Sequence, residues 1–365
     1  MRDLGLAFLL LCLGACAVFA RGEDWHKDAD AAIREGVSYL ATTVNADGSW
    51  GKKKQPAISA LAALAMTGVA SADTATSQAA VEAAMTFVTG FAREDGSVQS
   101  PVRILKVIKM SGYPVYTTSI ALLAMDADDP EGYRETMKAA RTYLKSMQIS
   151  EAGTMAGGFG YDRGKRADLS NTNWATEALH KTAYLDAEPF GDTPGAASKE
   201  TAEIWSTLTE FLGQVQSMPT ADNPEADGGL AYSPSAKLVS TGAMTYAGLK
   251  AMVYAKLDRN DPRVRGAMRY IQHHYTVLEE PAKGDAGLFY YYLTMAKALN
   301  AYGSDTIQTP QGDRLWRQEL VTQIISLQRE DGSWLNENGR YFEALPELVT
   351  SYAILALREA LGGPS

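Results

Sequence analysis

The side chains best suited to acid or binding chemistry lie around Asp168, just before an apolar segment of the chain. The run Asp168-Leu169-Ser170-Asn171-Thr172-Asn173-Trp174 combines a carboxylate, two amides and an indole. At a helix start that faces a cavity, Asp168 could act as an acid or bind a ligand, while Asn171, Asn173 and Trp174 would line the cavity mouth. The alternative is a helix N-terminus whose polar side chains hydrogen-bond to its own backbone.

Glu343 and Glu347 form a second acidic candidate, because both precede the last apolar segment of the chain. Two carboxylates on either side of a scissile bond are the arrangement that glycoside hydrolysis requires. The alternative is that these residues stabilise the first turn of a helix, where the helix dipole favours a negative charge.

Tyrosine is frequent near the predicted starts of these segments, and the chain has 18 Tyr against 9 Phe. A tyrosine presents an apolar ring with a polar tip, which suits a ligand of both characters. It suits packing between helices equally well, with the hydroxyl group bonded to backbone. The tyrosines that we expect at the ligand cavity are Tyr116, Tyr161, Tyr246, Tyr290, Tyr291 and Tyr292.

The composition argues against several classes of site. The chain has 34 Lys+Arg against 43 Asp+Glu, a net charge of −9, so we expect no nucleic-acid partner and no polybasic membrane contact. Its two cysteines, Cys12 and Cys16, lie in the N-terminal apolar segment and its four histidines are scattered, so we expect no metal site. No P-loop or dinucleotide fingerprint is present, so we expect no cofactor.

The first residues have the order of a secretory signal peptide, with Arg2 before an apolar run and small residues after it. Cleavage before Arg21 would suit signal peptidase, whereas Leu13-Gly14-Ala15-Cys16 resembles a lipobox that would place a lipid on Cys16. We therefore predict a signal segment over residues 1–20 and an exported periplasmic or cell-envelope protein. A lipid on Cys16 would be its only membrane anchor.

A short turn signature recurs along the rest of the chain at intervals of 45 to 70 residues, as in repeat proteins. An amphipathic segment precedes each copy, and a more apolar, Ala-rich segment follows it, which predicts an outer and an inner helix in each repeat. The six copies centre on Gly48, Gly96, Gly158, Gly228, Gly287 and Gly332.

Six signatures with two helices each predict about twelve helices and little strand. An open array would need a polar cap at each end, but the last segment, residues 349–361, is still apolar. We therefore predict an all-α fold over residues 21–365, a single closed α/α toroid of about six helical hairpins with inner and outer rings.

The last signature resembles a known family. Gln328-Arg329-Glu330-Asp331-Gly332-Ser333-Trp334 matches Q-x-x-x-G-x-W, the repeat motif of squalene and oxidosqualene cyclases, which prenyltransferase β-subunits share more loosely. The resemblance covers roughly residues 29 to 361 and implies an α/α toroid with a central cavity. The other copies are degenerate at the Trp position.

The resemblance also implies where a cyclase would keep its acid, in a D-x-D-D-T motif at the start of an inner helix. Asp168 to Thr172 stands in that register, but Ser170 and Asn171 replace two acids, which argues against protonation-driven cyclisation. The literal D-x-D-D of residues 126–129 follows an inner segment, where a solvated capping turn is expected. Prenyltransferase zinc chemistry would need an internal cysteine, and the predicted mature chain has none beyond Cys16.

Three functions stay open. The first is an exported toroid that binds a hydrophobic or amphipathic small molecule, or a protein partner, in its cavity. The second is an isoprenoid-modifying enzyme of squalene-cyclase type with an altered acid, and the third is a carbohydrate-active toroid that uses Asp168, Glu343 or Glu347. A fold of this kind hosts enzymes and non-enzymatic domains alike, so the function depends on the site.

Overall fold

The structure is a computed structural model that describes residues 24–362, with gaps at 53, 71–72, 101–103, 106–107, 110–112, 165, 187–195, 222 and 236. For 104–105, 108–109 and 196–201 it describes the backbone only. The predicted signal segment and Cys16 lie outside the described residues. Within these residues no helix has the length and apolarity needed to cross a bilayer.

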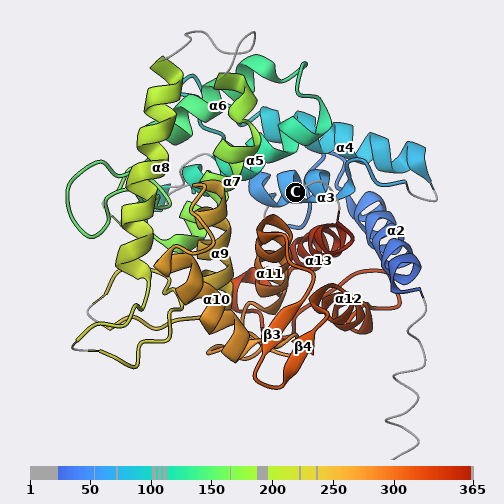
Figure 1. The fold of residues 1–365 in the computed structure, drawn as a ribbon. Coiled ribbons are helices and arrows are strands. Elements are labelled where there is room, and N and C mark those ends of the chain that lie inside the picture. The colour runs from blue at the N-terminus through green and yellow to red at the C-terminus, as the bar shows by residue number, and fades with distance from the viewer. Residues whose placement is uncertain are drawn as a thin grey trace, which may run out of the picture.

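The described chain folds into twelve α-helices in two concentric rings, as the sequence predicts (Figure 1). The only strands in this part form two short hairpins, β1 (Ile104–Leu105) with β2 (Ile108–Lys109) and β3 (Ile307–Thr309) with β4 (Gly312–Arg314). Two 3₁₀ turns, η2 (Ala183–Asp186) and η3 (Arg340–Phe342), lie in loops. The outer helices are α2 (Trp25–Thr43), α4 (Thr74–Thr89), α6 (Arg134–Ser146), α8 (Ala196–Val215), α10 (Pro262–His274) and α12 (Trp316–Ser326). The inner helices are α3 (Pro56–Met66), α5 (Pro114–Asp128), α7 (Leu169–Lys181), α9 (Gly242–Tyr254), α11 (Leu288–Tyr302) and α13 (Pro346–Ala360).

The inner ring is closed, because each inner helix packs against the next and α13 packs against α3 (Figure 1). Side chains of the last repeat join the first across this contact. Gln328 Nε2 donates to the carbonyl oxygen of Ala32 at 3.0 Å, and Arg358 donates to that of Leu64 at 3.1 Å. The prediction of a closed α/α toroid is confirmed.

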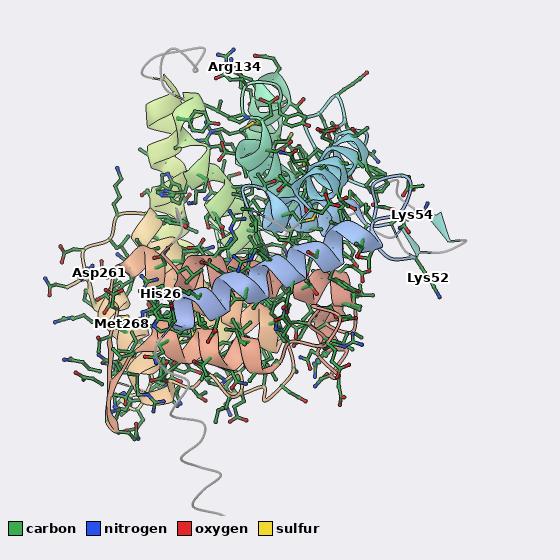
Figure 2. The ribbon with its side chains drawn as sticks, turned by 90° about the vertical axis from the view of Figure 1, so that its right-hand side faces the viewer. His26, Lys52, Lys54, Arg134, Asp261 and Met268 are labelled. Atoms are coloured by element: carbon green, nitrogen blue, oxygen red, sulfur yellow. The ribbon has the colours of Figure 1, made fainter. Side chains whose placement is uncertain are left out.

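The two rings differ in burial as their patterns predict. Outer helix α2 buries one stripe that includes Ile33, Val37 and Leu40, and it crosses the outside of the molecule in Figure 2. Inner helix α13 is buried on nearly its whole circumference. A helix with apolar residues on nearly all sides is expected to be buried, and the inner ring buries α13 in this way.

The glycine of each signature turn has a backbone conformation that other residues rarely adopt. Gly96 has φ +84°, and a Cβ there would lie 2.2 Å from the carbonyl oxygen of Ala139 on the next outer helix. Only glycine combines this φ with so close a contact. In the third copy the equivalent residue is Gly157, with φ +83°, so the prediction of Gly158 was off by one. In the fifth copy Gly287 is the N-cap of α11.

A threonine in each of four inner helices ties that helix to its signature turn. Thr172 Oγ1 accepts a hydrogen bond from the backbone N–H of Phe159 at 3.0 Å. The same contact recurs from Val98 to Thr118, from Leu230 to Thr245 and from Trp334 to Thr350, at 2.9 to 3.0 Å. These threonines therefore set one common register for the residues that face the ring axis.

Candidate functional site

The amino-terminal ends of the inner helices gather at one face of the ring, where α5, α7, α9 and α11 are each capped by the loop of the next repeat. The first N–H groups of a helix lack partners within the helix. Val115 N donates to the carbonyl oxygen of Tyr161, and Leu169 N donates to that of Tyr232. Glu280 and Glu343 cap α9 and α11 in the same way with their side chains. This succession of caps positions the loop tyrosines and the acids of the candidate site.

Asp168 is buried and is the N-cap of α7. Its carboxylate accepts from the backbone N–H and from the side-chain amide of Asn171, both at 2.8 Å. Burial raises the pKa of Asp168 despite these hydrogen bonds. The alternative stated above, a helix N-terminus satisfied by its own side chains, describes this geometry.

Glu343 turns away from α13, the helix that it precedes, and caps α11. Its carboxylate accepts from Tyr290 N at 2.9 Å and from Asn336 Nδ2 at 2.7 Å. Glu347 lies in the first turn of α13, where its side chain is beside Gly51 of the loop that precedes α3. The structure therefore engages Glu343 as a helix cap and gives Glu343 and Glu347 different neighbours. Burial raises the pKa of Glu343.

Six side chains from four inner helices meet across the ring axis just below this face. We call them the axial cluster. The hydroxyls of Tyr116 and Tyr352 lie 3.1 Å apart, and Ser170 Oγ lies 3.0 Å from the Tyr290 hydroxyl. The members are Tyr116, Ser170, Asn173, Trp174, Tyr290 and Tyr352, from α5, α7, α11 and α13. Of the predicted cavity residues, Tyr116, Asn173, Trp174 and Tyr290 thus lie together.

Ser170 and Tyr352 were not among the predicted cavity residues. Tyr352 stands two residues after Thr350, just as Trp174 stands two residues after Thr172. The common register of the threonines therefore indicates that Tyr352 faces the axis. Burial raises the pKa of Tyr116 to about 12, which keeps its hydroxyl neutral at any ordinary pH.

Three other predicted cavity residues point elsewhere. The hydroxyls of Tyr291 and Tyr292 donate to the carbonyl oxygens of Thr276 and Val277, in the loop after outer helix α10. Tyr246 packs against Tyr291, with ring centroids 5.8 Å apart. These tyrosines fill the space between helices, so their prediction as cavity residues is corrected. Adjacent helical residues point in different directions, and only Tyr290 of its triplet faces the axis.

Several polar atoms of α7 are buried without a hydrogen-bond partner among the described residues. They are the Oδ1 atoms of Asn171 and Asn173 and the Nε1 atom of Trp174. Each of these three residues is at most 2% exposed. A buried polar group without a partner destabilises a fold by about 1–3 kcal/mol, and such groups are rare.

Exposed aromatic residues stand above the axial cluster in the capping loops. We call them the aromatic rim: Tyr113, Tyr161, Tyr232, Tyr341 and Phe342, which are 38 to 59% exposed. The rings of Tyr113 and Tyr161 are 5.1 Å apart, and Tyr232 donates to the Tyr161 hydroxyl at 3.5 Å. Tyr113, Tyr341 and Phe342 have positive φ values of 50°, 60° and 68°. Such strain in bulky residues is costly and is concentrated at ligand-binding sites.

A buried ion group lies deeper in the ring, and the sequence analysis missed it. The carboxylate of Glu177 on α7 receives one lysine on each oxygen, Lys250 from α9 and Lys297 from α11. The side chains are 4%, 1% and 7% exposed. Lys297 Nζ lies 5.1 Å from the Trp174 ring centre, which places this group directly below the axial cluster.

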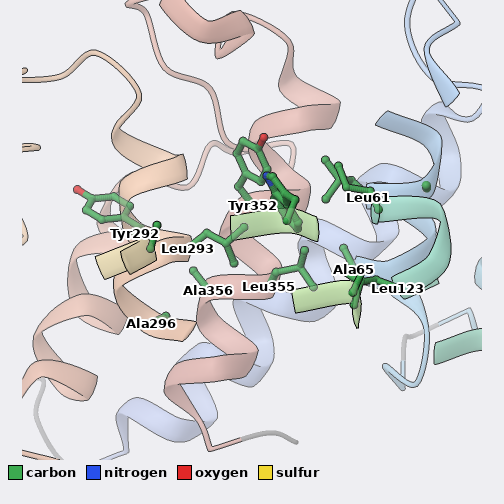
Figure 3. Packing of buried hydrophobic residues seen from close by; sticks show 14 of the residues in the cluster. Leu61, Ala65, Leu123, Tyr292, Leu293, Ala296, Tyr352, Leu355 and Ala356 are labelled. Atoms are coloured by element: carbon green, nitrogen blue, oxygen red, sulfur yellow. The ribbon is translucent and has the colours of Figure 1, made fainter. Parts of the chain in front are cut away.

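The other half of the ring interior at this depth is filled by leucines. Leu123 and Leu355 stand five residues after Thr118 and Thr350, the same offset that separates Glu177 from Thr172. With Leu61 and Leu293 they pack into the continuous core seen in Figure 3. Side chains of the protein itself therefore fill the interior below the axial cluster.

The literal D-x-D-D lies at the carboxyl-terminal end of α5, away from Asp168. Asp129 accepts from the N–H of Gly132 at 2.9 Å, and Asp126 accepts from the Tyr184 hydroxyl at 2.5 Å. Asp128 lines a cavity of about 480 Å³ between the end of α3 and α4. The predicted turn is confirmed, but Asp129 is the C-cap of α5 and does not cap the next helix, because α6 begins at Arg134 with Tyr133 as its N-cap. Among the described residues, no His, Cys, Asp and Glu side chains are grouped as metal ligands.

Comparisons with known proteins support the fold and go no further. No family model matches the chain, and no curated protein matches it. Solved structures do match at 13% identity. One is a variant of the type II terpene cyclase MstE from Scytonema in complex with geranylgeranyl dihydroxybenzoate, with a TM-score of 0.53 over 92% of this chain and 98% of that one.

Two further matches are glycosidases. A glycosidase variant in complex with glucose has a TM-score of 0.53 over 94% of this chain and 100% of that one, at 13% identity. A family 76 glycoside hydrolase from a bovine Bacteroides thetaiotaomicron strain has a TM-score of 0.56 over 91% and 78%, also at 13% identity. The chain is thus an α/α toroid of the architecture that terpene cyclases and glycosidases share, which confirms the resemblance at the level of fold.

Proposed function

We propose that this protein is an exported toroid that binds an amphipathic ligand at the amino-terminal face of its inner ring. The observation that carries the proposal is the position of the aromatic rim above an axial cluster of hydroxyl, amide and indole groups. Exposed aromatic rings around a few convergent polar groups are the composition of ligand sites. The signal segment predicted over residues 1–20 would place this site outside the cytoplasm.

Binding fits the site better than either form of catalysis. A cyclase acid must be free to protonate an alkene, but both oxygens of Asp168 accept from Asn171. A glycosidase needs two carboxylates at the scissile bond, but Glu343 is held by the end of α11 and by Asn336. The acids of this face therefore act as helix caps that hold the loops in place.

The test is native mass spectrometry of the protein purified from its own envelope fraction, before and after organic extraction. We expect a non-covalent mass that is lost on extraction. The double variant Tyr161→Ala/Tyr232→Ala should lack this mass. Tyr184→Ala, at the opposite end of the ring, should retain it. A wild-type mass that equals the bare chain would refute the proposal. The same spectrum shows whether the chain starts at a lipid-bearing Cys16 or at Arg21.

A further inference from the structure

We infer that the ligand of this face is a neutral, hydroxyl-rich ring, such as a sugar residue of a glycan or glycoside. The inference rests on the proposed function and specifies its ligand class. It starts from the unpartnered polar atoms of α7, which are one donor, the Trp174 Nε1–H, and two acceptors, the Oδ1 atoms of Asn171 and Asn173. A ligand rich in hydroxyl groups supplies both donors and acceptors to such a set.

The unpartnered atoms adjoin side chains that solvent reaches. Asn173 Nδ2 donates to the Tyr290 hydroxyl at 3.4 Å, and the Trp174 ring lies 6.0 Å from the Tyr116 ring. Tyr116, Ser170 and Tyr290 are half-buried. Rotation of side chains is common when a ligand binds, and Tyr116 and Tyr290 are the ones that would turn.

The charges around the axial cluster disfavour an ionic ligand there. At the rim, Lys283 and Arg340 lie beside Tyr341, and Lys283 is paired with Glu280. The carboxylates of Asp168 and Glu343 are held by helix ends. Lys297, below Trp174, is paired with Glu177, so it is not available to an anion. Every other polar group of the axial cluster is uncharged, because burial raises the pKa of its tyrosines. A charged group would be desolvated here without a counter-ion, which is costly.

The density of polar groups disfavours a purely apolar ligand as well. The hydroxyls of the cluster already pair with one another, but an isoprenoid chain would leave the Trp174 indole N–H and the Asn173 amide oxygen without a partner. The apolar face of a sugar ring can instead stack on the rim rings while its hydroxyls reach the polar groups. The leucines and the ion group close the ring interior below the axial cluster. The terminal sugar of a glycan therefore fits better than a glycan chain that passes through the ring.

The test is isothermal titration of the purified protein with four neutral oligosaccharides: maltohexaose, cellohexaose, mannohexaose and chitohexaose. Geranylgeraniol in detergent and a proline-rich peptide serve as competing probes. We expect at least one oligosaccharide to bind. Asn173→Leu and Trp174→Phe each remove one of the three unpartnered atoms and keep most of the side-chain volume. Each should weaken oligosaccharide binding about tenfold. Thr209→Val on outer helix α8 should leave it unchanged.

The outcomes separate this inference from the proposed function. Binding of geranylgeraniol or of the peptide that is lost in Tyr161→Ala/Tyr232→Ala, with no oligosaccharide bound, would uphold a ligand site and overturn the sugar assignment. Oligosaccharide binding that is unchanged in both α7 variants would also overturn it, since the unpartnered atoms would then play no part. Failure of every probe, together with a bare native mass, would refute both.

Discussion

Replacing Glu177 by Gln should be among the most destabilising single changes in the inner ring. The amide keeps the shape of the side chain but removes the carboxylate that both buried lysines contact directly. Removing one partner of a buried ion pair typically costs about 3–5 kcal/mol, because an uncompensated charge remains in the interior. A domain is stable by only about 5–15 kcal/mol, so this loss is a large part of the total.

Lys250→Met should cost far less than Glu177→Gln, and this asymmetry is the sharper expectation. Without Lys250, Glu177 and Lys297 form a one-to-one pair, and the repulsion between two ammonium groups is gone. Burial lowers the pKa of Lys250 to about 8, with Lys297 adding to the effect and Glu177 opposing it. The folded chain thus releases this proton before the unfolded chain does, so the free energy of unfolding should rise between about pH 8 and 10.5. Lys250→Met should lack that rise.

The measurement is urea unfolding of both variants and of the wild type by circular dichroism, at pH 7.5 and pH 9.5, with linear extrapolation to water. A triple change of Glu177, Lys250 and Lys297 to Leu, Met and Met serves as the control. It should be close to neutral, because apolar replacements of buried ion groups often are. The reasoning would be refuted if Glu177→Gln cost less than about 1 kcal/mol, or if Lys250→Met cost as much as Glu177→Gln.

Three further changes test the turns and caps. Gly96→Ala should cost about 1–3 kcal/mol, from its φ of +84° and its contact with the Ala139 carbonyl, whereas Gly213→Ala on α8, with open space around it, should be neutral or stabilising; thermal melts compare the two. Thr172→Val should cost about 1–3 kcal/mol in urea unfolding, because it leaves the buried N–H of Phe159 unpaired. A loss below half of that would contradict the role of this threonine in holding the signature turn. Asp168→Asn should cost little at pH 7, since Asn also caps helices, while Asp168→Ala should cost about 1–2 kcal/mol. Because the pKa of Asp168 is raised in the fold, the wild type should gain stability relative to Asp168→Asn as the pH falls toward 3.8. A stability difference between the two that does not change with pH would count against this cap.

The fold was predictable because the signature recurs in register. Turn, apolar segment and starting threonine repeat together, and the apolar last segment indicates that the ring closes. In the third copy the sequence could not distinguish the turn glycine, because Gly157 and Gly158 are adjacent and fit the same pattern. In the structure only Gly157 has a positive φ.

The site was predictable only where it follows that register. Trp174 and Tyr352 face the axis because each stands two residues after the threonine that binds its signature turn. Glu177 and Lys250 each stand five residues after the threonine that binds the signature turn of their repeat, Thr172 and Thr245. Even so, a lone charge in an apolar segment does not indicate its partner until the segments are aligned in space. Glu280 escaped prediction because it lies in a loop whose length differs from repeat to repeat.

Closure of the ring also limits what can fold while the chain is being synthesised. Helix α3 packs on one side against α5 and on the other against α13, which ends at Ala360. A chain made from its amino end therefore emerges with one flank of its first repeat bare, and that flank stays bare until α13 has been made. If the chain crosses a membrane unfolded, this apolar flank must be protected from aggregation on the far side until translocation is complete. The yield of folded protein would then depend more on a chaperone that binds the unfolded chain there than on any single contact in the folded ring.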